Sequence, residues 1–134
     1  MINSVIHHLG IGLRHPKAAE PFFDNLLVDF LSMTKEEVWE SIAGWKGRGT
    51  RIYLYPVKNG SPPGAIQHLA FTARNRREVE DFPGWALSRG FEIIDSPCEY
   101  PKYGRDYFAV FFRGPENLKL ELVYLPESDH AEPL

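Results

Sequence analysis

The sequence has few of the features that mark secreted, membrane-bound or nucleic-acid-binding proteins. Cys98 is its only cysteine, which excludes a disulfide within the chain and a zinc site built from cysteines. No apolar run is long enough to span a bilayer, and the first residues lack the basic segment and apolar stretch of a signal peptide. The net charge of −3 argues against a nucleic-acid or anionic-membrane partner, because both reward a basic surface. We therefore expect a cytoplasmic protein that binds neither.

The composition that is present is typical of a globular protein. The chain has 134 residues, of which 43% are hydrophobic and 25% are charged. This length is enough for one domain with its own hydrophobic core and too short for two large ones. We therefore treat residues 1–134 as a single domain.

A repeat divides this domain into two similar halves. Residues 7–15 and residues 67–75 both place a histidine, His8 or His68, at the head of a segment in which apolar residues alternate with others. Each segment then continues with arginine and a residue that can cap a helix. A period of two predicts a strand with one face in the core. The apolar residues of the two strands are Leu9, Ile11 and Leu13 in the first copy and Leu69, Phe71 and Ala73 in the second.

A helix is predicted after each of these strands. Pro16 suits the first helical position of one helix, Asn75 is a good N-cap of the other, and Gly90 is a natural C-terminal stop. Pro21 and Pro83 lie inside the helices and should kink or shorten them. The apolar stripes at helical spacing are Ala19, Phe22, Phe23, Leu26 and Leu27, and then Val79, Phe82 and Leu87.

Three further strands are expected in each copy, which makes each a βαβββ unit. The first copy has a weak strand at residues 30–33, a second at 38–43 and a clear one at 51–57, reached through a turn at 46–49. Thr34 with Glu37 resembles a capping box and could open a short helix instead of the second strand. The second copy has strands at 91–96, 107–112 and 118–125, and a turn at 114–117 joins the last two as a hairpin. The units span 4–58 and 65–126, with a linker at 59–64 and a tail at 127–134.

Metal-competent side chains occupy matching positions in this pattern. In the last strand, Glu121 alternates with apolar residues, as His8 and His68 do in theirs. Two imidazoles and a carboxylate form a set that leaves coordination positions open, suited to Fe(II), Mn(II), Zn(II), Ni(II) or Co(II). Taken singly, each of the three is more typical of a structural or solvated residue. The neighbours on the same faces are small and leave room for a ligand: Gly10, Gly12, Ala70 and Thr72.

Tyrosines are the other candidates for a functional site. A tyrosine combines an apolar ring with a polar tip, which suits the wall of a small-molecule pocket. The predicted substrate pocket is lined by Tyr53, Tyr55, Tyr103 and Tyr107.

Three motifs in the chain have counterparts in a known family. These are H-H-L-G-I-G-L-R-H, Q-H-L-A-F-T-A-R-N and Y-F-A-V-F-F-R-G-P-E-N-L-K-L-E-L-V. Through them the chain resembles the vicinal oxygen chelate superfamily, which includes glyoxalase I, extradiol dioxygenases, fosfomycin-resistance enzymes and bleomycin-resistance proteins. The resemblance implies an α+β fold in which two βαβββ repeats form a curved, mostly antiparallel half-barrel pair. It also implies that His8, His68 and Glu121 bind a divalent metal ion.

The same resemblance implies the chemistry. The expected protein is an enzyme that chelates two adjacent oxygens of a small substrate on the metal, for isomerase or lyase chemistry of the glyoxalase type, with Glu121 also exchanging protons. An extradiol-type dioxygenase and a bleomycin-resistance-like binding protein are the alternatives. Tyr53 stands where glyoxalase I has a further ligand, and Phe111 lies about where the dioxygenases have a tyrosine. The resemblance also implies a homodimer, and the metal site could form within one chain or across two.

Overall fold

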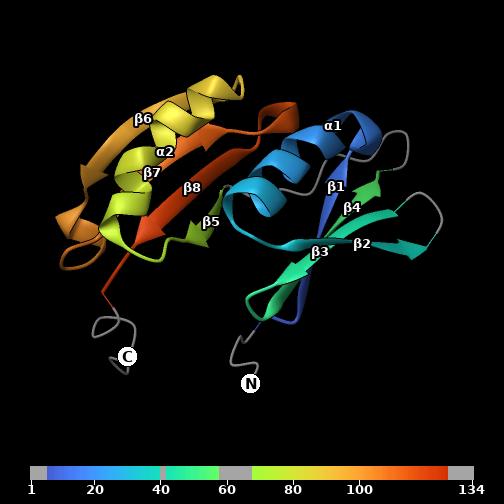
Figure 1. Ribbon diagram of the computed structural model, residues 1–134, viewed down its shortest axis with the longest axis horizontal. Helices are drawn as coiled ribbons and strands as arrows, with labels where there is room; N and C mark the ends of the chain where they lie inside the picture. Colours follow the sequence, from blue (N-terminus) through green and yellow to red (C-terminus); the bar gives the residue numbers. More distant parts are fainter. Residues whose placement is uncertain (1–5, 40–41, 58–67, 127–134) are drawn as a thin grey trace. The chain divides into compact units, whose positions relative to one another are not determined.

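The computed structural model describes residues 6–39, 42–57 and 68–126 of the chain. The chain divides into two compact units, Met1–Ala65 and Ile66–Leu134. The predicted linker at 59–64 and the predicted tail at 127–134 lie outside the described residues. Figure 1 shows the elements of both units.

The first unit is a four-stranded mixed sheet with one helical segment. Its strands lie in the order β1-β4-β3-β2, where β1 and β4 are parallel and the other neighbours are antiparallel. The elements follow the chain as β1 (His8–Leu13), α1 (Pro16–Phe23), the π-helix η1 (Asp24–Phe30), β2 (Thr34–Trp39), β3 (Ile42–Gly47) and β4 (Thr50–Pro56).

The second unit repeats this topology. Its strand order is β5-β8-β7-β6, again with one parallel pair, β5 with β8, and two antiparallel pairs. The predicted α+β fold of two βαβββ units with mostly antiparallel sheets is therefore confirmed. The elements are β5 (Leu69–Thr72), α2 (Arg76–Ser88), β6 (Glu92–Glu99), the 3-10 turn η2 (Pro101–Tyr103), β7 (Phe108–Arg113), the 3-10 turn η3 (Pro115–Asn117) and β8 (Lys119–Tyr124).

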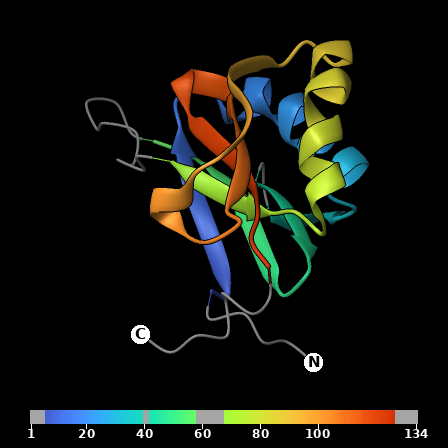
Figure 2. The ribbon, with the colours of Figure 1, turned by 90° about the vertical axis from the view of Figure 1, so that its left-hand side faces the viewer.

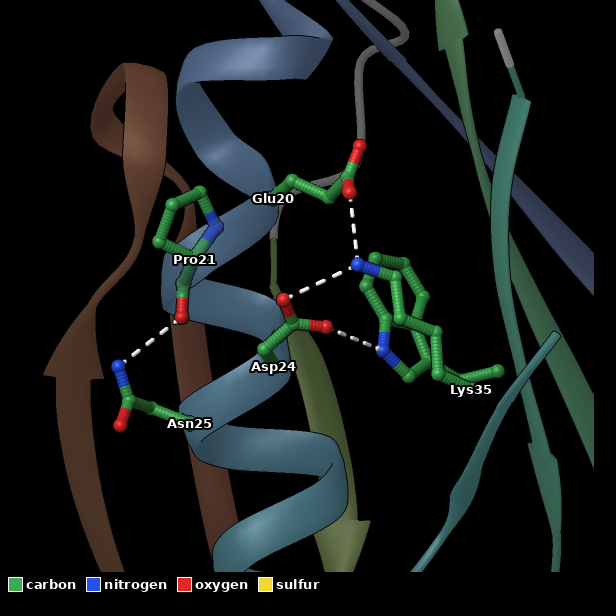
Figure 3. Close-up of polar contacts among 6 residues, drawn as sticks. Glu20, Pro21, Asp24, Asn25 and Lys35 are labelled. Atoms are coloured by element: carbon green, nitrogen blue, oxygen red, sulfur yellow. Dashed lines mark hydrogen bonds and ion pairs between the residues drawn. The ribbon is translucent and has the colours of Figure 1, made fainter. Parts of the chain in front are cut away.

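The core of the first unit lies between its sheet and its helical segment. Trp45 of β3 is fully buried, and its ring centroid lies 5.8 Å from that of Phe23 at the end of α1. The indole N–H of Trp45 donates a 3.1 Å hydrogen bond to Asp24, whose other carboxylate oxygen binds the Lys35 ammonium (Figure 3). Lys35 also binds Glu20 at 2.6 Å, so three elements meet at this lysine. Apolar burial supplies most of the stability of such a layer.

The core of the second unit lies between α2 and its sheet. Figure 2 shows α2 running along one side of the strands of this unit. The ring of Phe82 on α2 packs 4.6 Å from that of Phe112 on β7, measured between centroids. The Asn75 side chain accepts a 2.8 Å hydrogen bond from the Glu78 N–H, and Gly90 has a φ of +77° just past the helix end. Both predicted helix boundaries are thus confirmed.

The weak strand predicted at residues 30–33 is wrong. The helical segment η1 ends at Phe30, and the residues after it fold back onto the helix: Leu31 N–H donates to the Leu26 carbonyl and Met33 N–H to the Leu27 carbonyl. These N–H groups are used to end the helix and are not available for a strand ladder. Pro21 lacks the N–H of a regular α-helix, and its carbonyl accepts the Asn25 side-chain amide at 2.9 Å. The helical stretch changes from α to π form at Asp24, shortly after this proline.

The strand predicted at residues 38–43 is also wrong in its boundaries. Trp39 at the end of β2 pairs with Ile42 at the start of β3, so the stretch belongs to two strands. Residues 40–41 lie outside the described part. The alternative of a short helix opening at Thr34 is wrong as well, because Thr34 pairs with Lys46 in the sheet. No glycine or proline marks the change of strand in the sequence, and only the pairing reveals it.

Candidate functional site

The faces opposite the helices carry the predicted metal ligands. In β8, Leu120 and Leu122 belong to the core, so alternation places Glu121 on the other face. Glu121 pairs with Ala70 of β5 on one side and with Phe111 of β7 on the other. His68 directly precedes β5, two residues before Ala70. The sheet register therefore places His68, just before β5, and Glu121 of β8 on the same face.

The equivalent place in the first unit holds a different residue. Gly10 of β1, two residues after His8, pairs with Tyr53 of β4, just as Ala70 pairs with Glu121. Tyr53 is thus the structural counterpart of Glu121. The His8 ring lies 5.8 Å from the Tyr53 ring, and its Nδ1 is 2.9 Å from Nδ1 of His7. The first unit accordingly presents an imidazole beside a phenol.

Glu121 is the centre of the site in the second unit. It is 1% exposed and is the one buried charged residue among those the structure describes. The His68 imidazole Nε2 lies 3.4 Å from Glu121 Oε1, and the Tyr107 hydroxyl donates a short hydrogen bond to Oε2. Burying a neutral polar group without a hydrogen bond costs roughly 2–7 kcal/mol. Burying an ionised carboxylate costs more, unless hydrogen bonds or a cation offset the loss of hydration.

The distance between the His68 and Glu121 ligand atoms matches that of two ligands on one metal ion. Two atoms bound to one tetrahedral metal at about 2.1 Å lie about 3.4 Å apart, which is the observed separation of His68 Nε2 and Glu121 Oε1. An imidazole nitrogen and a carboxylate oxygen are also the donor types that such metals prefer. The pair therefore fits two ligand positions of a divalent ion. Within the described part of the chain, no group of three or more His, Cys, Asp or Glu side chains gathers to hold one.

Aromatic side chains surround this pair in the second unit. The Phe111 ring lies 6.4 Å from that of His68, and the ammonium of Lys119 lies 4.8 Å above the Phe111 ring. Tyr100 contacts Phe111 with ring centroids 5.6 Å apart. Sequence reasoning did not assign Phe111, Lys119 or Tyr100 to the pocket. Alternation along β7 and β8 could have done so for Phe111 and Lys119, because both lie on the face of Glu121.

The four predicted pocket tyrosines fall into two pairs, one in each unit. Tyr53 and Tyr55 lie with ring centroids 6.3 Å apart, and Tyr103 and Tyr107 lie 5.5 Å apart. Burial raises the pKa of the Tyr107 hydroxyl above its ordinary value, and the hydrogen bond to Glu121 raises it further. Tyr107 is therefore protonated at neutral pH and acts as a hydrogen-bond donor.

Sequence comparison identifies the family. The Glyoxalase/Bleomycin resistance protein/Dioxygenase superfamily matches residues 5–122, which is most of the chain. The chain belongs to this superfamily. The resemblance seen in the sequence motifs is thus confirmed.

Across the described residues, no helix has both the length and the apolar character needed to cross a bilayer.

Individual relatives match most of the chain. An uncharacterized protein of Bacillus subtilis (strain 168), YqjT, is 26% identical over 128 residues, covering 88% of this chain and 97% of the relative. A glyoxalase/bleomycin resistance protein from Albidiferax ferrireducens T118 has a similar fold, with a TM-score of 0.73 and 18% identity over 92% of this chain and 100% of that one. A lactoylglutathione lyase from Agrobacterium tumefaciens has a TM-score of 0.67 and 16% identity, covering 91% and 93% of the two chains. At these identities, the solved structures support the fold alone.

Proposed function

We propose that this member of the superfamily is a metal-dependent enzyme whose ligands are His8, His68 and Glu121. The buried carboxylate of Glu121 carries the proposal. Its described partners are an imidazole and a phenol, and neither carries a fixed positive charge. A divalent cation on the His68 side would offset the cost of burying this charge. Family membership over residues 5–122 supports the same reading.

The substrate would be a small molecule with two adjacent oxygens, and the reaction an isomerase or lyase reaction of the glyoxalase type. A bound divalent metal supplies Lewis-acid stabilisation of negative charge on such oxygens. The chain supplies the rest: Glu121 would accept a proton on Oε1 when that oxygen is displaced from the metal during turnover and would then return it, while Tyr107 holds the opposite oxygen. The aromatic rings of Phe111 and Tyr103 would exclude water from the bound substrate.

The metal content of the untagged protein tests the proposal. We expect near-stoichiometric metal in the wild type after gentle purification, measured by mass spectrometry. His68→Ala and Glu121→Gln should each weaken metal binding by more than tenfold, because each removes a direct ligand. Loss in His8→Ala would assign the third ligand.

Two surface variants serve as matched controls. His15→Ala removes an imidazole at the start of α1, and Glu80→Gln removes an exposed carboxylate that pairs with Arg76 on α2. Both should keep the metal. The enzyme hypothesis would be abandoned if the wild type is metal-free and also refuses Fe(II), Mn(II), Co(II), Ni(II) and Zn(II).

A second candidate function is small-molecule binding without turnover, as in a bleomycin-resistance protein. The aromatic cluster of the second unit favours it: Tyr100 and Tyr103 stack at 5.6 Å, and both rings contact Tyr107. Such rings can hold a planar ligand without any metal. A screen of vicinal diols, α-keto aldehydes and catechols with metal-loaded protein separates the two functions, since tight binding without product supports the binding protein.

The homodimer stays a prediction, which analytical ultracentrifugation would test.

A further inference from the structure

Tyr107 reaches the buried carboxylate from the loop before β7. Its hydroxyl donates to Glu121 Oε2, while Oε1 faces the His68 imidazole. The 3.4 Å separation between His68 Nε2 and Oε1 is longer than the usual 2.7–3.2 Å of an N–H···O hydrogen bond. The two oxygens of one carboxylate are therefore unequal: Oε2 is occupied by a strong donor and Oε1 is not.

Tyr107 is itself held in place by its surroundings. Its carbonyl accepts a 2.9 Å hydrogen bond from Tyr100 N–H, and its own N–H donates to the Gly104 carbonyl at 3.3 Å. Its ring meets those of Tyr100 and Tyr103 edge-on, with centroids 6.3 and 5.5 Å away. A side chain fixed at both backbone and ring keeps its hydroxyl aimed at one oxygen. Such outer hydrogen bonds orient metal ligands.

We propose that Tyr107 is a positioning residue that restricts Glu121 to binding a metal through Oε1 alone. The inference rests on the proposed function, because it concerns the same metal site. A carboxylate can bind a metal through one oxygen or through both. With Oε2 held by Tyr107, the second coordination position that Glu121 could fill stays open for a substrate oxygen. Tyr107 thereby favours ligands that bind through two oxygens.

The test compares a ligand with two adjacent oxygens and a ligand with one. Zn(II)-loaded wild type, Tyr107→Phe and Tyr124→Phe are titrated with catechol and with phenol by calorimetry. In Tyr107→Phe the freed Oε2 competes for the open position, so catechol affinity should fall by about tenfold while phenol affinity changes little. Tyr124→Phe removes a hydroxyl from β8 on the face opposite Glu121, since alternation places Tyr124 with Leu120 and Leu122, and it should leave both affinities unchanged.

The outcomes separate the inference from the function on which it rests. If the wild type takes up no metal, the proposed function fails and the role of Tyr107 fails with it. If all three proteins take up Zn(II) and Tyr107→Phe binds catechol as the wild type does, the metal site stands and the role of Tyr107 is refuted. A crystal structure of the Zn(II)-loaded wild type gives an answer even if Tyr107→Phe does not fold: both Glu121 oxygens on the metal would refute the inference, and Oε1 alone would support it.

Discussion

At the scale of single residues, two acidic side chains show how surroundings decide the role of a carboxylate. Glu121 is buried between the His68 imidazole and the Tyr107 phenol. Removing a carboxylate from water is costly unless neighbouring groups stabilise it. Asp24 is partly exposed, yet one of its oxygens accepts the N–H of the fully buried Trp45. Its ion pair with Lys35 is exposed to solvent, so the hydrogen bond to Trp45 matters more to stability.

Replacing Asp24 tests this assignment. Asp24→Ala leaves the buried indole N–H of Trp45 without its acceptor and should lower the free energy of unfolding by about 1–3 kcal/mol. Asp24→Asn keeps an acceptor oxygen while removing the charge, and Lys35→Ala removes only the exposed pair, so each should cost under about 1 kcal/mol. Urea denaturation followed by tryptophan fluorescence measures all three. Equal losses in Asp24→Ala and Asp24→Asn would contradict the hydrogen-bond argument.

At the scale of elements, α2 is a helix whose beginning and end are both encoded locally. Asn75 caps the Glu78 N–H, and the Glu78 carboxylate accepts the Arg74 N–H at 2.9 Å, which satisfies two donors at the helix start. Pro83 lies inside α2, and the helix nevertheless runs from Arg76 to Ser88. Packing of Phe82 against the sheet offsets the hydrogen bond that the proline removes. Pro83 is expected from the sequence to kink or shorten the helix, and the shortening does not occur, because α2 extends five residues beyond the proline to Ser88.

The cap of α2 gives a prediction at this scale. Asn75→Ala should destabilise the protein by about 1 kcal/mol, because the Glu78 N–H loses its acceptor. Asn75→Gly should cost only a few tenths of a kcal/mol, since a glycine leaves the N–H accessible to water. Thermal unfolding by circular dichroism measures both. A loss in the glycine variant as large as in the alanine variant would show that the side-chain cap is not the cause.

At the scale of the whole molecule, metal binding and folding stability should be linked. A ligand that binds only the folded state raises the free energy of unfolding by about 2.7 kcal/mol at 100 times its dissociation constant. We therefore expect the melting temperature of the wild type to rise with added Zn(II) and to return on chelation. Glu121→Gln should show little rise, and the surface variant Glu80→Gln should behave as the wild type. Equal shifts in the two variants would place the metal elsewhere on the chain.

The site illustrates what sequence alone can and cannot predict. Alternation in β5 and β8 placed His68 and Glu121 on related faces, and the structure brings the two together at 3.4 Å. His8 lies in the other unit beside Tyr53, and its place in the ligand set stays a prediction. The donation from Tyr107 to Glu121 was not foreseen, because these residues meet across strands. A contact of this kind depends on strand register, which one sequence does not encode locally.

What the sequence determined by itself was the repeat, most of the strands and the ends of α2. These follow from hydrophobic periods and capping residues that act over a few positions. What only the tertiary structure decided was the continuation of α1 into η1, the division of residues 34–47 into two strands, and the unequal surroundings of the two Glu121 oxygens. The physical reason is the same for all three. Each depends on which hydrogen-bond donors and acceptors the packed chain leaves available, and that is settled only when distant segments meet.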